Sequence, residues 1–350
     1  MPPINSMGLP IGKHVRLFDA YLEFLDSKES MDEDDEDAQE AMSINDFPTY
    51  LAKLVRHTFL SRFTEIQGRW GEYTRQVDLE DFEEYTSSRF GRFTDIPEKG
   101  LNGQYDEIAI REFDNEKLRL KEWGAAFSVT RQMIISDRLN KIAELPSLLA
   151  EALTRTMSKR AAINCLQANP VMYDGNALIS AAHGNRVTTA LAATVQGSLD
   201  QQTLDLKFDD MVDDEGYAIV TPGNRTLLIP SELRFIAQAL NNNQLLPNGA
   251  SALEVNLIQG HFDNIIIEPF FTDATDYYVL ADPTGPMSPI AFITLNGNTT
   301  PFIGLRDPGV RAYLGGNDPY SFDFDEIKYK IRHDFHFKPV EWRGIIGSQQ

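Results

Sequence analysis

The sequence has little cysteine and no long apolar run. Its 350 residues include one cysteine, Cys165, which excludes an intrachain disulfide framework and any multi-cysteine metal site. Cys165 lies in an apolar, helix-like stretch, so we expect it to be a small buried side chain. No stretch approaches the roughly 18 apolar residues of a transmembrane helix, and the N-terminus lacks the apolar segment of a signal peptide.

Positive charge is also scarce. The chain carries 32 Lys and Arg against 52 Asp and Glu, a formal net charge of −20. Broad nucleic-acid binding and attachment to an anionic membrane both need clustered cations, so neither is expected. The excess is uneven, because residues 26–40 contain nine acids and one lysine, a local charge of −8. Such a block repels itself and indicates a solvated arm.

Signatures of catalysis are missing. The sequence has no phosphate-binding glycine loop, no dinucleotide fingerprint, no zinc-protease helix and no nucleophile elbow. Of the six histidines only His333 and His336 are close, and their odd separation places them on opposite faces of a strand. His183, among turn-forming residues, is a weak candidate ligand. We therefore expect no catalytic, metal or cofactor-binding residue and no enzymatic activity.

The first strong pattern is an amphipathic helix over residues 50–67. Apolar side chains, among them Leu51, Leu54, Phe59 and Phe63, recur at three- and four-residue spacing, and a glycine follows. Basic residues fall among them. They could meet the acidic run of the same chain or of a neighbour, or simply face solvent.

Residues 72–127 favour β-structure. The stretch 117–121 alternates between basic and apolar residues, and the cluster PEKGLNG at 97–103 favours a turn. Strands so polar on both sides of the turn indicate an arm that projects from the body. A long helix follows, at about 139–169, closed by Asn169 and Pro170.

Beyond residue 170 the pattern is α+β. It predicts strands at 226–229, 265–268, 277–281 and 290–295, a helix at 231–240, a long loop at 241–251 and a final strand at 322–332.

Five segments, in order, resemble the major capsid proteins of tailed bacteriophages, most closely those of Mu-like and related prophages. They are WGAAFSVTRQ at 123–132 with ISD at 135–137, DGNAL at 174–178 with SAAHGN at 180–185, TLLIP at 226–230 with SEL at 231–233, DYYVLADP at 276–283, and YKIRHDF at 329–335 with EWRG at 341–344. Each is weak alone, but five in one order across residues 75–350 form a specific pattern.

The resemblance implies the Hong Kong 97-type fold, an α+β architecture with four named parts. These parts are an N-terminal arm (residues 1–71), an extended β-hairpin called the E-loop (72–126), a P-domain with a spine helix (127–215, closed by a returning strand at 311–350) and an A-domain (216–310). Residues 1–71 are shorter than the cleaved scaffolding domain of many family members. A separate scaffolding protein is therefore expected.

The resemblance also suggests subunit-contact residues. They are Pro97, Glu98, Lys99, Gly100, Asn102 and Gly103 at the E-loop tip, Leu51, Leu54, Phe59 and Phe63 on the helix of the arm, and Asn241, Asn242, Asn243 and Gln244 in a loop at the capsomer axis. Some relatives crosslink a hairpin lysine to the next subunit, and Lys99 could serve there or be an ordinary exposed lysine.

The predicted function is that of a major capsid protein. Its copies would form pentamers and hexamers in an icosahedral shell that encloses DNA without reading its sequence. Portal and scaffolding proteins, and a possible decoration protein, would be its partners. We expect assembly in the host cytoplasm and residence in the virion. The alternatives are an encapsulin-like compartment that holds cargo enzymes and an acidic soluble enzyme.

Overall fold

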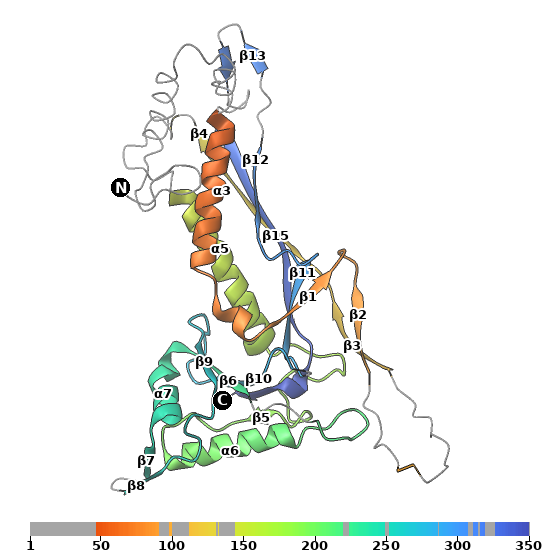
Figure 1. Cartoon of the computed structure of the whole chain (residues 1–350), viewed down its shortest axis with the longest axis vertical. Helices are drawn as coiled ribbons and strands as arrows, with labels where there is room; N and C mark the ends of the chain where they lie inside the picture. Colours follow the sequence, from red (N-terminus) through yellow and green to blue (C-terminus); the bar gives the residue numbers. More distant parts are fainter. Residues whose placement is uncertain are drawn as a thin grey trace. The chain divides into compact units, whose positions relative to one another are not determined.

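The computed structural model is shown in Figure 1. It describes residues 47–90, 98–99, 112–130, 132, 144–219, 224–248, 252–285, 287–306, 311–313, 316–318 and 326–349. The chain divides into two compact units, and each is assembled from segments far apart in the sequence. The first unit takes residues 1–67, 123–154 and 300–333, and the second takes 68–122, 155–299 and 334–350.

Helices and strands alternate irregularly along the described residues. The helical elements are α3 (Phe47–Glu65), η2 (Arg69–Glu72), α5 (Leu145–Lys159), the π-helical η4 (Arg160–Gln167), α6 (Val195–Asp209), η5 (Ser231–Leu233), α7 (Arg234–Asn242) and η6 (Trp342–Gly344). The strands are β1 (Arg75–Leu79), β2 (Tyr85–Phe90), β3 (Glu112–Leu118), β4 (Glu122–Thr130), β5 (Arg186–Val187), β6 (Arg225–Ile229), β7 (Leu245–Asn248), β8 (Ala252–Val255), β9 (Asn264–Ile267), β10 (Tyr277–Ala281), β11 (Ile290–Leu295), β12 (Phe302–Arg306), β13 (Arg311–Tyr313), β14 (Gly316–Asp318), β15 (Glu326–Pro339) and β16 (Ile345–Ser348).

In the first unit α3 packs beside strand β12 and is tied to α5. Phe59 and Phe63 of α3 are buried, with parallel rings 6.2 Å apart. Beside Phe63 in the helix, Arg62 forms an ion pair of 2.7 Å with Glu151 of α5. The first half of β15 pairs antiparallel with β12, and β4 pairs with β15 as well.

The second unit contains a five-stranded sheet in the order β5-β16-β10-β6-β9. Strands β6 and β10 are buried along their whole length, which matches their mostly apolar sequences, although β6 begins with the polar residues Arg225 and Thr226. Side chains from α6, α7 and β7 join those of the sheet in one core, for example Phe208, Leu240 and Leu246.

Further strands of the second unit lie near the β2–β3 hairpin. Strand β1 pairs parallel with β11, and β11 pairs antiparallel with the second half of β15. The hairpin strands β2 and β3 pair antiparallel, with a bulge between Thr86 and Ser88. The base of the hairpin is less polar than its sequence suggests, because Leu118 and Leu120 are buried against Ala291 and Ile293.

Several predicted elements are confirmed. Helix α3 matches the amphipathic pattern at 50–67, and α5 with η4 forms a helix from 145 to 167 that Asn169 terminates with a positive φ of 45°. The predicted helix start near 139 lies outside the described residues. All four predicted strands between 226 and 295 are present, as β6, β9, β10 and β11.

Two expectations were wrong, and one helix was missed. Residues 241–251 are not a long loop, because α7 extends to Asn242 and the hairpin strands β7 and β8 follow. Helix α6 was not expected at all. The stretch 117–121 is not one strand, since β3 ends at Leu118 and β4 begins at Glu122, although burial alternates through it as predicted.

Candidate functional site

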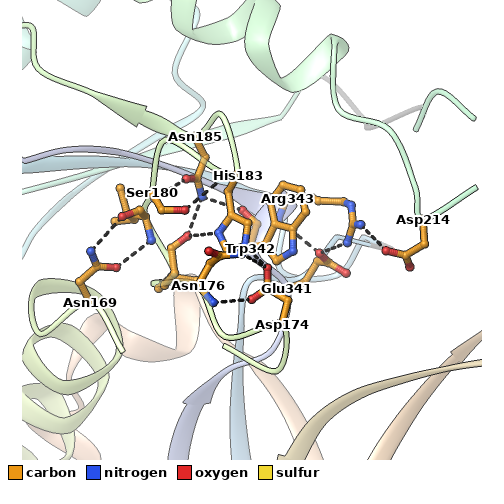
Figure 2. Close-up of polar contacts among 12 residues, drawn as sticks. Asn169, Asp174, Asn176, Ser180, His183, Asn185, Asp214, Glu341, Trp342 and Arg343 are labelled. Atoms are coloured by element: carbon orange, nitrogen blue, oxygen red, sulfur yellow. Dashed lines mark hydrogen bonds and ion pairs between the residues drawn. The ribbon is translucent and has the colours of Figure 1, made fainter. Parts of the chain in front are cut away.

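Two segments singled out by the resemblance, residues 174–185 and 341–344, meet in one buried polar cluster (Figure 2). They are about 160 residues apart in the sequence, yet Asn185 donates a hydrogen bond from Nδ2 to the carbonyl oxygen of Trp342 at 3.2 Å. The same amide group donates to the carbonyl oxygen of Leu178 at 2.8 Å. Asn185 has no exposed surface, so it serves as an internal brace between the two segments.

His183 connects the same segments through its ring. Its Nε2 lies 2.7 Å from Asp174 Oδ2 and its Nδ1 lies 3.1 Å from the carbonyl oxygen of Leu178. The imidazole stacks on the indole of Trp342, with centroids 4.3 Å apart and planes 6° from parallel. Burial opposes ionisation of Asp174, but hydrogen bonds from Asn176 and His183 hold its pKa below the ordinary value of 3.8.

Arg343 forms the other end of the cluster, with its guanidinium 4.2 Å from the centre of the Trp342 ring (Figure 2). It donates to Asp214 Oδ1 at 2.7 Å, to Glu341 Oε1 at 3.0 Å and, from Nε, to the carbonyl oxygen of Val212 at 2.8 Å. Arg343 is 3% exposed and Glu341 is 4% exposed. A buried arginine with this many partners fixes the 341–344 segment to the 212–214 segment at one point.

Gly344, in the last of the resembling segments, is required for a steric reason. A Cβ atom on Gly344 would lie only 2.0 Å from the carbonyl oxygen of Met287, which belongs to the backbone and cannot move aside as a side chain could. The residue after Arg343 must therefore be glycine for the 341–344 segment to reach the chain just before β11.

Two more of the resembling segments become neighbouring strands. Strand β6 pairs antiparallel with β10, so that Leu228 lies opposite Tyr278, and β10 pairs with β16 directly after the 341–344 segment. Two of the five segments thus lie side by side in one sheet, the 341–344 segment leads directly into a third strand of it, and the 174–185 segment is fastened to that strand because the N–H of Gly347 donates to the carbonyl oxygen of Asn185. The pattern that the sequence shows is a folding core, and its residues have buried structural partners.

The histidines and the cysteine behave as packing residues. Burial lowers the pKa of His333 to about 4, and burial also lowers that of His336 to about 4, with help from nearby Lys121. Burial raises the pKa of the Cys165 thiol well above its ordinary value. Among the described residues there is no group of three or more His, Cys, Asp or Glu side chains that could hold a metal ion.

The structure describes the predicted subunit-contact residues to different extents. At the E-loop tip the structure describes only Glu98 and Lys99, both exposed, and Pro97, Gly100, Asn102 and Gly103 lie outside the described residues. A role in contacts stays a prediction.

The arm helix is placed more fully. Phe59 and Phe63 are 0% and 3% exposed within the chain itself, so their side chains pack α3 against the rest of the chain, and a role in subunit contacts stays a prediction. Leu51 and Leu54 lie in the same helix, but their side chains are outside the described part. Arg56 and Ser61 of α3 are exposed.

The four predicted axis-loop residues lie at the end of α7 and before β7. Asn241 and Asn242 belong to α7, and Asn241 bonds through its side chain to both the N–H and the carbonyl of Phe262. Asn243 and Gln244 are exposed. Sequence reasoning missed Asn256, whose side-chain amide donates to the carbonyl oxygen of Asn243 at 2.8 Å and thereby closes the helix end.

Glu268, just after β9, is a buried acid that the sequence did not reveal. It is 3% exposed, and its Oε1 finds no hydrogen-bond partner among the described residues. Burial raises its pKa to about 7, although a backbone hydrogen bond from Phe270 and the charge of Arg69 oppose this. Nearby Tyr73 is fully buried, and burial together with the charge of Glu268 raises its pKa well above 10.

The fold is the Hong Kong 97-type α+β fold. Chains of similar structure come from Mycobacterium phage Cain and Microbacterium phage Oxtober96, each with a TM-score of 0.50. The first is 9% identical and covers 81% of this chain and 90% of its own, and the second is 12% identical and covers 81% and 91%. A virus-like particle protein from Pyrococcus furiosus, 11% identical with a TM-score of 0.49, covers 85% of this chain and 98% of its own.

Residues 115–348, about two thirds of the chain, match the family described as phage capsid protein, and the chain belongs to that family. It is a structural protein, a major capsid protein whose copies form an icosahedral shell in the virion. No curated protein matches the sequence. In the described part of the chain no helix is both long and apolar enough to cross a membrane.

Proposed function

We propose that the chain builds the phage head by assembling into pentamers and hexamers that close around DNA, and that it catalyses no reaction. The observation that carries the proposal is an exposed apolar face on the β7–β8 hairpin. Membership of the phage capsid protein family favours this role over a cargo compartment or a soluble enzyme.

The register of the hairpin places four apolar residues on one face. Leu245 lies opposite Val255, and Pro247 lies opposite Leu253. Directly opposed residues, and residues two apart on one strand, share a face of a β-ribbon. Leu245, Leu253 and Val255 are 47%, 67% and 62% exposed.

The opposite face of the hairpin is anchored. Leu246 is fully buried in the core that also contains residues of β6 and β10. Asn256, 5% exposed, fastens the end of β8 to the end of α7. An isolated two-stranded ribbon with a solvated apolar face would be marginal in water. Contact with the same hairpin of neighbouring subunits around a capsomer axis would cover this face.

The remaining parts of the proposal concern the arms and partners. The hairpin formed by β2 and β3 is the E-loop and would reach a neighbouring subunit, as would the exposed side of α3. The domain division at residues 71, 126, 215 and 310 belongs to this proposal too. Scaffolding would come from a separate protein, with a portal and a possible decoration protein as further partners and the host cytoplasm as the place of assembly.

Replacing Leu253 with aspartate should abolish or strongly reduce assembly while the chain stays folded, because the charge would have to be buried in the contact. We expect a circular dichroism spectrum like that of the wild type and a shift from shells to small species in sedimentation velocity. The matched control is Ala252→Asp, which places the same charge at an exposed position on the opposite face of the same hairpin, away from the apolar face, and should still form shells. Normal shells from Leu253→Asp would contradict the proposed contact.

A further inference from the structure

A row of three cations lies at the base of the E-loop hairpin. Lys117, Arg119 and Lys121 are all exposed, whereas the residues between them, Leu118 and Leu120, are 3% and 2% exposed. The alternation places the three basic side chains on the solvent side of an extended segment, about 7 Å apart. Neither Arg119 nor Lys121 forms an ion pair with another described residue.

Further charged groups, both basic and acidic, lie beside the row. Lys338 of β15 donates from Nζ to the carbonyl oxygen of Lys117 at 2.7 Å and pairs with Glu116 at 2.7 Å. Lys117 pairs with Glu84 at 2.8 Å. Burial is the main reason that the pKa of His336 is low, and the positive charges of Lys121, Lys338 and Arg160 lower it further. These three cations therefore act on the same small region.

The chain itself contains a segment that matches this surface in charge and spacing. Residues 26–40 hold nine acids and one lysine, and residues 32–37 are six acids in succession. In an extended segment, alternate acids of such a run repeat at the same spacing of about 7 Å as the cations of the row. We propose that the cation row formed by Lys117, Arg119 and Lys121, with Lys338 beside it, binds the acidic segment 26–40 of another copy of this chain.

Contact between copies is favoured because each subunit carries a net charge of −20. Subunits of like charge repel one another as a shell closes, unless opposite charges meet at their contacts. One cation row and one acidic segment per chain give equal numbers of both in any closed shell. DNA is the polyanion that could compete for the row, but DNA bound there would not reduce the repulsion between subunits.

This proposal rests on the assembly of the chain into a shell, and reversing the charges on each side tests it. Arg119→Glu with Lys121→Glu should raise the concentration needed for assembly by roughly tenfold, since exposed ion pairs are individually weak. Asp34→Lys with Asp35→Lys should do the same. When the two folded variants are mixed in equal amounts, shells should form again near the wild-type concentration, because the basic arm of one variant can then meet the acidic row of the other, and the unaltered arm and row can meet as in the wild type.

The controls separate the possible outcomes. Arg155→Glu with Arg234→Glu makes the same charge change at exposed arginines outside the row and should assemble like the wild type. Wild-type shells in the same assay show that the proposed function holds whatever the variants do. Two outcomes would overturn the proposal: a mixture that assembles no better than its components, and row variants that form normal shells but retain less nuclease-protected DNA.

Discussion

Replacing Arg343 with methionine is expected to lower the free energy of unfolding by about 3–5 kcal/mol, the typical effect of removing one partner from a buried ion pair. The guanidinium, whose residue is 3% exposed, donates to Asp214, Glu341 and the carbonyl of Val212. Methionine fills much of the volume beside Trp342 but donates nothing, so the carboxylate of Glu341 would stay buried without its cation.

Urea unfolding of the purified chain at pH 7, followed by tryptophan fluorescence, measures this effect. Arg155→Met, at an exposed position of α5, is the matched control and should change the stability by less than about 0.5 kcal/mol. Combining Arg343→Met with Asp214→Asn should be less damaging than the sum of the two single changes, because they remove the same ion pair. An Arg343→Met variant within about 1 kcal/mol of the wild type would show that the buried cluster does not hold the fold together.

The second large effect concerns pH. Glu268 has a pKa of about 7 against an ordinary value of 4.5, so the folded chain favours the neutral carboxyl. The stability that this preference contributes is complete below about pH 4.5 and is lost as the pH rises through 7. At pH 8.5 the wild type must therefore hold a buried carboxylate, at a cost of at most about 3 kcal/mol.

Glu268→Gln should remove that cost, since glutamine stays neutral. We expect the variant to be more stable than the wild type by about 1–3 kcal/mol at pH 8.5 and nearly equal to it at pH 4.5. Glu232→Gln, at an exposed position, is the control and should show no such growing difference. Stability curves of wild type and Glu268→Gln that run parallel from pH 4.5 to 8.5 would rule this effect out.

Elements whose buried face is apolar could be predicted from the sequence. Helix α3 and the α5–η4 helix have apolar residues at helical spacing, and strands β6 and β10 are short apolar runs. Helix α6 lacked this signal because its buried positions include Gly197, Ser198 and Gln201. The start of α6 does have an N-cap residue that the sequence could have indicated, because the hydroxyl of Thr194 accepts a hydrogen bond from the N–H of Gly197.

The segment 241–251 was misread for a different reason. Its three successive asparagines favour a loop by composition, but tertiary partners decide the outcome. Asn241 bonds to Phe262, and the α7 end is closed by Asn256, so the helix extends further than its composition predicts. The hairpin that follows has strands of only four residues each, and Leu246 is the one buried residue in them, so no alternating pattern indicates it in the sequence.

The segments that form the buried cluster were recognised in the sequence, but the contacts between them could not be predicted from it. The resemblance identified 174–185 and 341–344 without indicating that they touch. Asp214, the partner of Arg343, is one of 52 acids and carries no pattern that separates it from the rest. Glu268 is hidden for the same reason, because its pKa depends on burial and not on its neighbours in the sequence.

Electron microscopy of the purified, assembled protein tests the central claim most directly. We expect closed icosahedral shells in which every pentamer and hexamer is built from this chain, with nuclease-protected DNA inside particles isolated from infected cells. A protein that stays in small oligomers at every concentration in the microscope and in the ultracentrifuge, or shells that hold a cargo enzyme instead of DNA, would contradict the account.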